Sequence, residues 1–254
     1  MLYPKVAFIA GAIVAVGSPS LFAAYPLAVD DADVVPPGEV EIVVAGAIEK
    51  AGRERAYSCP LLQISVGVAD NLEMGLEGGY QYAESRTRGE ARDRVDGFHD
   101  TILSAKRKWF DEKGRRPSLA TELAIHFPTG SARKGLGSGN VDFGFLVSAT
   151  RTWGGTALDV NAGYNLIGAF RSKHEDDTAF YGLALRRFVI ESVELLGEVF
   201  AETPSNAFSD TALIFNSGLQ WEFMDDLFFG VAAGAGLTSE SPDYLATAGI
   251  TRVF

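Results

Sequence analysis

Residues 71–82 read NLEMGLEGGYQY, and their side chains alternate between two characters. Leu72, Met74, Leu76, Tyr80 and Tyr82 are apolar or aromatic, while the residues between them are glutamate, glutamine or glycine. This period of two is typical of a β-strand with one apolar and one polar face. The stretch is also as long as a tilted strand that crosses a membrane, roughly 9–11 residues.

The same alternation recurs along the chain, for example in Leu119–Phe127, Thr156–Leu166 and Leu213–Phe223. It predicts about twelve strands of similar length, and a closed barrel is the arrangement of strands that satisfies every backbone polar group in lipid. The predicted fold is therefore all-β, an antiparallel up-and-down transmembrane β-barrel over residues 39–254. Its predicted strands are 39–49, 58–68, 72–82, 98–109, 118–127, 141–151, 156–166, 178–188, 193–202, 212–223, 227–237 and 244–254.

The predicted connections alternate between short and long, as the periplasmic turns and external loops of outer-membrane barrels do. Short turns are expected at Ala69–Asn71, Thr152–Gly155, Val189–Ser192 and Met224–Asp226, and longer loops at Lys50–Tyr57, Ala83–Gly97, Pro128–Asn140, Ile167–Asp177, Thr203–Thr211 and Thr238–Asp243. The glycines of Pro128–Asn140 suggest a phosphate-binding loop, but no Gly-Lys-Ser/Thr follows them. We interpret this segment as a glycine-rich external loop.

The N-terminus has the features of an export signal. Lys5 precedes the apolar run Val6–Gly17, and the small residues Ala23 and Ala24 follow a Ser-Pro-Ser break. This order is that of a cleaved secretory signal peptide, here residues 1–23, and the run is too short for a transmembrane helix. Residues 24–38 are then expected to be a short periplasmic segment, and the bacterial outer membrane is the expected location.

Composition argues against several functions. The chain carries 22 Lys and Arg against 33 Asp and Glu, a formal net charge of -11, so nucleic-acid binding is not expected. The single cysteine, Cys59, excludes a disulfide framework and a thiolate zinc cluster, and three histidines argue against a multi-His metal site. Cys59 is expected to face inward by its alternation with Leu62 and Ile64. No nucleophile–base pair can be placed around His126, so we expect neither an enzyme nor a cofactor.

If the apolar faces meet lipid, the polar faces line the lumen. Asp100 and Lys106 would share one face of the fourth strand and form cross-strand pairs. Two hypotheses remain open: the charges pair and fill the lumen, or they line a polar conduit whose acidic excess favours cations. The candidate lumen-lining residues are Asp100, Lys106, Glu122, His126, Asp142, Asp159, Arg186 and Glu198.

The last predicted strand, Tyr244–Phe254, closes on an aromatic residue. This ending resembles the signal that the outer-membrane assembly machinery reads. The expected partners are thus outer-membrane lipid, the assembly machinery through Phe254, and a small-molecule solute of unspecified identity.

Several short motifs occur in a characteristic order: Leu61–Glu77, Gly97-Phe-His-Asp100, Phe127-Pro-Thr-Gly130, Gly135-Leu-Gly-Ser-Gly139 and Asn161-Ala-Gly-Tyr164. In this order, and over about Asp33 to Phe254, the chain resembles the outer-membrane transporter family labelled "MetA-pathway of phenol degradation". The resemblance implies an outer-membrane β-barrel that admits aromatic or other hydrophobic compounds. Residues Tyr25–Gly38 are too short for the N-terminal plug of the larger fatty-acid channels.

The sequence thus favours an outer-membrane channel for passive passage of small molecules. The alternative is a closed structural barrel, or one that binds partners through its loops Ala83–Gly97 and Pro128–Asn140, without transport.

Overall fold

The computed structural model describes residues 25–85, 93–168, 176–204 and 210–254. The predicted signal peptide, residues 1–23, lies outside these ranges. Within these ranges the regular elements are strands, except for one 3-10 turn, Ala132–Lys134. In the described part of the chain, no helix is long and apolar enough to cross a membrane.

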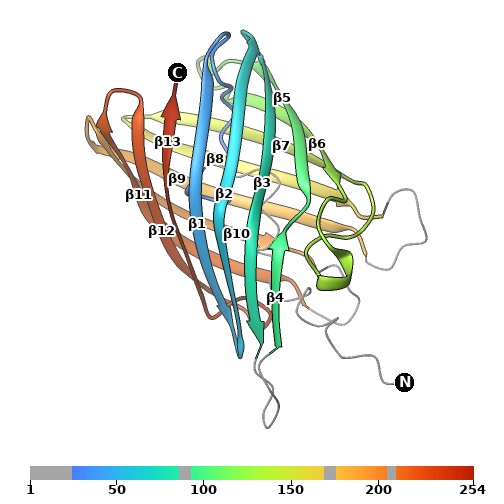
Figure 1. Cartoon of the computed structure of the whole chain (residues 1–254). Coiled ribbons are helices and arrows are strands. Elements are labelled where there is room, and N and C mark those ends of the chain that lie inside the picture. The colour runs from blue at the N-terminus through green and yellow to red at the C-terminus, as the bar shows by residue number, and fades with distance from the viewer. Residues whose placement is uncertain (1–24, 86–92, 169–175, 205–209) are drawn as a thin grey trace, which may run out of the picture.

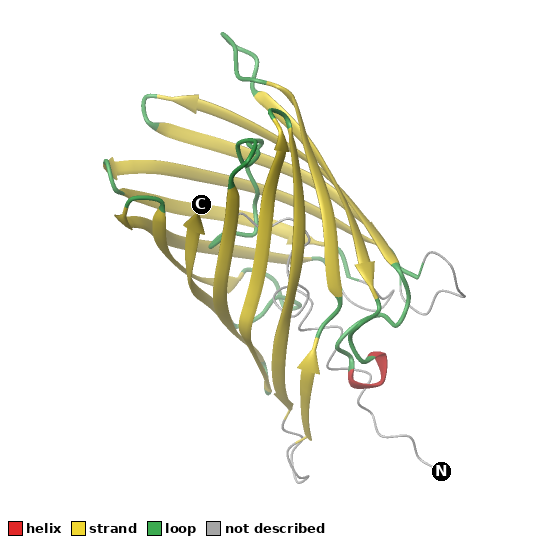
Figure 2. Ribbon diagram, turned by 45° about the horizontal axis from the view of Figure 1, so that its top comes forward, coloured by secondary structure: helices red, strands yellow, loops and turns green. Residues whose placement is uncertain are grey.

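The strands form one sheet that closes into a barrel (Figures 1 and 2). Every pairing is antiparallel, consecutive strands are neighbours except that β4 and β5 both pair with β3, and β1 pairs with β13 to close the ring. The strands are β1 Val40–Ala51, β2 Glu54–Ala69, β3 Leu72–Ser85, β4 Asp93–Phe98, β5 Thr101–Phe110, β6 Ser118–Phe127, β7 Asp142–Trp153, β8 Thr156–Leu166, β9 Thr178–Ile190, β10 Val193–Glu202, β11 Ala212–Met224, β12 Leu227–Gly236 and β13 Tyr244–Val253.

The predicted twelve-stranded barrel is confirmed, with one refinement. The fourth strand is broken at His99 and Asp100, so β4 and β5 are its two halves, and both pair with β3. The neighbouring strand β6 ends at Phe127, opposite Thr101. The loop that follows β6 contacts the break, where the Gly130 amide donates to Asp100. The break reverses the alternation, since Val95 is the buried inward position of β4, whereas Ile102 and Lys106 are those of β5.

The two faces of the strands differ as predicted. Outward side chains are largely apolar and exposed, including Val44, Leu76, Leu123, Phe145, Val160, Leu183, Leu195, Phe215, Trp221 and Ile250. Many inward side chains are polar and buried, including Ser65, Gln81, Lys106, Glu122, Ser148, Asp159, Asn161, Glu194, Glu198, Asn216 and Thr251. An apolar outer band around a polar interior is the pattern of a transmembrane barrel.

Two details of the first strands were predicted wrongly. The connection expected as the long loop Lys50–Tyr57 is a tight turn between Ala51 and Glu54, because β1 and β2 pair to their ends. Cys59 was expected to face inward but is exposed. A register shift between Ser58 and Leu61 explains this, since a bulge reverses the alternation on one side of itself.

The segment before β1 was also placed wrongly. Residues 24–38 were expected to form a short periplasmic segment, but within the described residues 25–38 the structure places Leu27, Val29 and Ala32 inside the barrel, where each is at most 3% exposed. The chain enters at the end of the short turns, where the Gly38 amide donates to the Gly67 carbonyl at 2.9 Å. The segment is short, but an extended chain of this length can still reach well into the barrel lumen. We call residues 25–38 the lumen segment.

Candidate functional site

Lys106 is the central cation of the lumen. It lies on β5 directly opposite Glu73 of β3 and Glu122 of β6. Its ammonium Nζ is 2.6 Å from the carboxylate of Asp30 and 3.9 Å from that of Asp31, both in the lumen segment. A buried ammonium needs such partners, since removing a charge from water costs several kcal/mol. Lys106 therefore connects the segment to the barrel wall.

Arg186 of β9 makes a second connection. Its guanidinium Nε lies 2.6 Å from Asp159 of β8, and its Nη2 lies 3.2 Å from Asp31. Glu194 of β10 is 3.8 Å away. The guanidinium thus lies among carboxylates from two neighbouring strands and from the lumen segment.

Lys108, two residues after Lys106 on β5 and nearer the short turns, makes a third connection between the segment and the barrel. Its Nζ is 2.8 Å from Asp33 and 2.7 Å from Asp111. In the exposed turn after β5, the hydrogen bond and charge of Lys108 lower the pKa of Asp111. Asp30, Asp31 and Asp33 therefore each meet a cation of the barrel.

Barrel side chains also satisfy the backbone of the segment. The amides of Ala28 and Val29 donate to the Glu198 carboxylate at 2.8–3.0 Å, and Asn216 donates to the same carboxylate at 2.6 Å. Asn161 bonds both the N–H and the C=O of Asp30, each at 2.7 Å. A buried backbone outside the sheet needs such partners, so these contacts fix its position.

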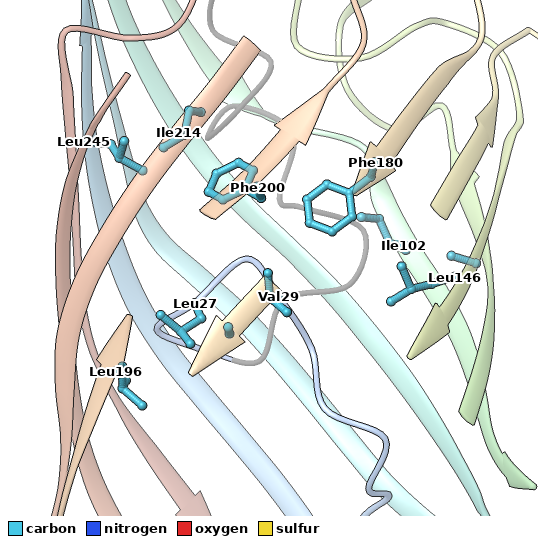
Figure 3. Packing of buried hydrophobic residues seen from close by; sticks show 11 residues of the cluster. Leu27, Val29, Ile102, Leu146, Phe180, Leu196, Phe200, Ile214 and Leu245 are labelled. Atoms are coloured by element: carbon cyan, nitrogen blue, oxygen red, sulfur yellow. The ribbon is translucent and has the colours of Figure 1, made fainter. Parts of the chain in front are cut away.

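The interior also contains an apolar ring. Leu27 and Val29 of the segment pack against inward side chains from β5, β6, β7, β9, β10, β11 and β13 (Figure 3). Phe180 and Phe200 form its aromatic part, with ring centroids 5.8 Å apart. The ring consists of Ile102, Ala124, Leu146, Phe180, Ala184, Leu196, Phe200, Ile214 and Leu245. Leu27 and Val29 are thus part of one buried apolar cluster inside the barrel, and Leu27, Ile102 and Leu196 also border a cavity.

A cavity of about 340 Å³ lies between the lumen segment and the wall formed by β1, β2, β3 and β5. Its lining includes Glu41, Gln63, Ser65, Glu73 and Glu77, together with Lys106, Glu122 and Arg186. Acidic side chains outnumber basic ones in this lining. Three of the predicted lumen residues, Lys106, Glu122 and Arg186, therefore line this cavity.

The other predicted lumen residues are placed differently. Asp159 and Glu198 are buried against Arg186 and the segment, as described above. Asp100 and Asp142 do not line the cavity: Asp100 accepts from the Gly130 amide at 2.8 Å and Asp142 from the Gly168 amide at 2.7 Å. Asp100 and Lys106 were expected to pair with side chains of neighbouring strands, but Lys106 forms its close ion pair with Asp30 of the lumen segment and Asp100 anchors the Pro128–Asn140 loop.

His126 faces inward on β6, and its Nε2 is buried without a hydrogen-bond partner, as is that of His99. The His99 Nδ1 lies 3.0 Å from the Asp100 carbonyl oxygen. Among the described residues, no three His, Cys, Asp or Glu side chains gather so that they could hold a metal ion.

Sequence reasoning missed the lumen-segment residues that complete the site, above all Asp30 and Asp31. The signal was nevertheless present: Asp30-Asp31-Ala-Asp33 precedes the first strand, and the inward positions of later strands carry Lys106, Lys108 and Arg186. An acidic run and three inward cations in a barrel of limited width are complementary charges.

The model of one protein family matches residues 32–252, nearly the whole barrel and part of the lumen segment. The chain belongs to this family. Its description is "Putative MetA-pathway of phenol degradation". The match confirms the resemblance found in the motifs. None of the curated proteins matches the chain.

Solved structures show the same fold at low identity. A COG4313 outer membrane channel from Pseudomonas putida F1 superposes with a TM-score of 0.71 at 15% identity, covering 88% of this chain and 98% of that one. The β domain of the Bordetella autotransporter BrkA gives 0.60 at 9% identity, covering 87% and 100%. The NanC porin gives 0.58 at 8% identity, covering 83% and 98%. The fold is that of bacterial outer-membrane barrels, and the apolar outer face fits that location.

Proposed function

We propose that the protein is an outer-membrane channel for passive passage of small molecules, with the lumen segment controlling its open cross-section. The observation that carries this proposal is the cavity of about 340 Å³ beside the segment, lined by ionisable side chains. A barrel that served only as a scaffold would gain nothing from a polar space inside it. The solved channel and porin of the same fold support the proposal. We propose no catalytic role.

The charge of the cavity bears on the solutes. Carboxylates from β1, β3 and β6 line the cavity together with Lys106 and Arg186, which are already paired with acidic groups. A narrow, low-dielectric passage lined in this way attracts cations and disfavours anions. Neutral and cationic solutes are therefore expected to pass in preference to anions of equal size.

The filled apolar ring favours the second candidate function, a closed barrel without transport. In that case Leu27 and Val29 would be permanent core residues. The two functions differ in what happens when the segment is loosened: a channel conducts more, while a closed scaffold only loses stability.

Flux into liposomes tests the proposed function. Refolded protein is expected to admit small neutral and cationic solutes faster than acids of the same size. Heat-modifiable migration on a detergent gel confirms folding in the same sample. No flux above protein-free liposomes, in the wild type and in variants with a loosened segment, would contradict the proposal.

Phe254 offers a separate prediction about assembly. Its side chain is exposed, its amide donates to Val40 where the barrel closes, and Arg252 lies over its ring at 5.5 Å. We propose that this residue engages the assembly machinery. Phe254→Ala should lower the amount of folded protein in the outer membrane of expressing cells, yet leave refolding in detergent unchanged. Equal cellular yield of Phe254→Ala and wild type would rule this role out.

A further inference from the structure

The apolar ring is unusual for the inside of this barrel. Apolar side chains that face an open, water-filled pore lose the gain of burial, about 25 cal/mol for each Å² exposed. Phe200 is 3% exposed, and Leu146 and Ile214 are 0% exposed, and all three belong to the buried cluster that also contains Leu27 and Val29. The ring therefore requires an apolar occupant, and the chain supplies one.

Polar groups lie directly beside the ring. The Glu198 carboxylate accepts from the amides of Ala28 and Val29, and the Asn161 side chain bonds both backbone groups of Asp30. If the segment withdrew, this carboxylate would lose two donors in a buried place, which is costly. A replacement occupant must therefore combine an apolar body with a hydrogen-bond donor.

Val29 of the lumen segment lies very close to Gly182 of β9. A Cβ on Gly182 would lie 2.4 Å from Val29 Cγ2, and the same position is 3.3 Å from the Phe180 ring. With valine at position 29, a side chain at position 182 would collide with the valine Cγ2, so Val29 packs directly against the β9 backbone at Gly182, beside the Phe180 ring.

We propose that the ring is a binding site for a small apolar solute that carries a hydroxyl or amine donor. Leu27 and Val29 of the lumen segment compete with this solute for the ring. Solute and lumen segment are alternative occupants of one site. The solute's apolar body replaces the two side chains, and its donor replaces the amides on Glu198. The inference rests on the proposed function, because it concerns the same lumen, and it adds the position of the site and the exchange of occupants.

A reversible tether tests the exchange. Val29→Cys leaves one γ atom where valine has two, which makes room for a Cβ at position 182, and the two positions are close enough for a disulfide between Val29→Cys and Gly182→Cys, made with Cys59→Ser so that no other thiol is present. The probe is 4-fluorophenol, followed by its ¹⁹F line width in lipid nanodiscs. Saturable binding is expected after reduction and should be at least about tenfold weaker in the oxidised form, because a ligand binds only the vacant fraction.

A second variant tests the proposal independently, in case the protein with the two cysteines does not fold. Leu27→Asn with Val29→Asn keeps the full chain but makes the built-in occupant polar, so the probe should bind about tenfold tighter than to wild type. Fluorobenzene, which lacks the donor, should bind this variant more weakly than 4-fluorophenol. Heat-modifiable migration confirms that each sample is folded.

Equal saturable binding to the oxidised and reduced tether would overturn the proposal, as would the absence of saturable binding in every folded variant. The test is independent of flux. Ring binding without any flux would contradict the proposed channel and retain the site, while flux without ring binding would do the reverse.

Discussion

Replacing Lys106 and Arg186 together by methionine is expected to raise solute flux through the reconstituted barrel by about tenfold or more. These two residues neutralise Asp30 and Asp31 at 2.6 and 3.2 Å. Without them the buried carboxylates of the segment have no cation, and breaking a buried pair in this way costs about 3–5 kcal/mol. Since 1.4 kcal/mol corresponds to a factor of about ten, the segment should leave its place in a much larger fraction of molecules. Liposome flux of a small neutral solute measures the change.

The neighbouring residues provide a matched control. Arg107 and Arg187 each follow one of the two cations on the same strand but face outward, where Arg107 lies over the Trp109 ring at 4.4 Å. Arg107→Met with Arg187→Met removes the same charge and should leave flux within about twofold of wild type, since outward surface charges act little across the wall. A lower flux in Lys106→Met/Arg186→Met than in wild type would contradict the segment's role as an obstruction.

Glu198→Ala is expected to lower the free energy of unfolding by about 3 kcal/mol, because three buried donors lose their acceptor at about 1–3 kcal/mol each. These donors are the amides of Ala28 and Val29 and the Asn216 side chain. Urea unfolding in detergent, followed by tryptophan fluorescence, measures the difference.

Glu191 is the control for this loss of stability, since it is an exposed carboxylate in the turn between β9 and β10. Glu191→Ala should change stability by less than about 0.5 kcal/mol. If Glu198→Ala unfolded at the same urea concentration as Glu191→Ala, the segment would contribute nothing to the stability of the barrel.

The barrel itself was predictable because each strand carries its own signal in a short stretch of sequence. Each strand shows its own alternation, as residues 71–82 do, and the apolar face must meet lipid while the polar face turns inward. The positions of Lys106, Glu122 and Arg186 beside the cavity followed from the same alternation. Cys59 shows the limit of this rule, since one register shift reverses the side that a residue faces.

The contents of the lumen were less predictable, because they depend on contacts between distant parts of the chain. Asp30 and Lys106 are far apart in sequence, and no periodicity links them. Asp100 illustrates the same difficulty: its partner is the amide of Gly130, thirty positions later, in a loop that folds back onto the strand break. Charge complementarity could have suggested the first contact, whereas the second depends on the backbone path of the loop.

The most direct measurement of the central claim combines the loosened segment with the tether. The protein would carry Lys106→Met and Arg186→Met together with Val29→Cys, Gly182→Cys and Cys59→Ser, and flux would be recorded before and after reduction. If the segment obstructs the channel, the oxidised protein should conduct no faster than wild type, and reduction should raise flux about tenfold. Equal high flux in both redox states would show that solutes pass without movement of the segment, and equal absence of flux would show that the barrel is closed.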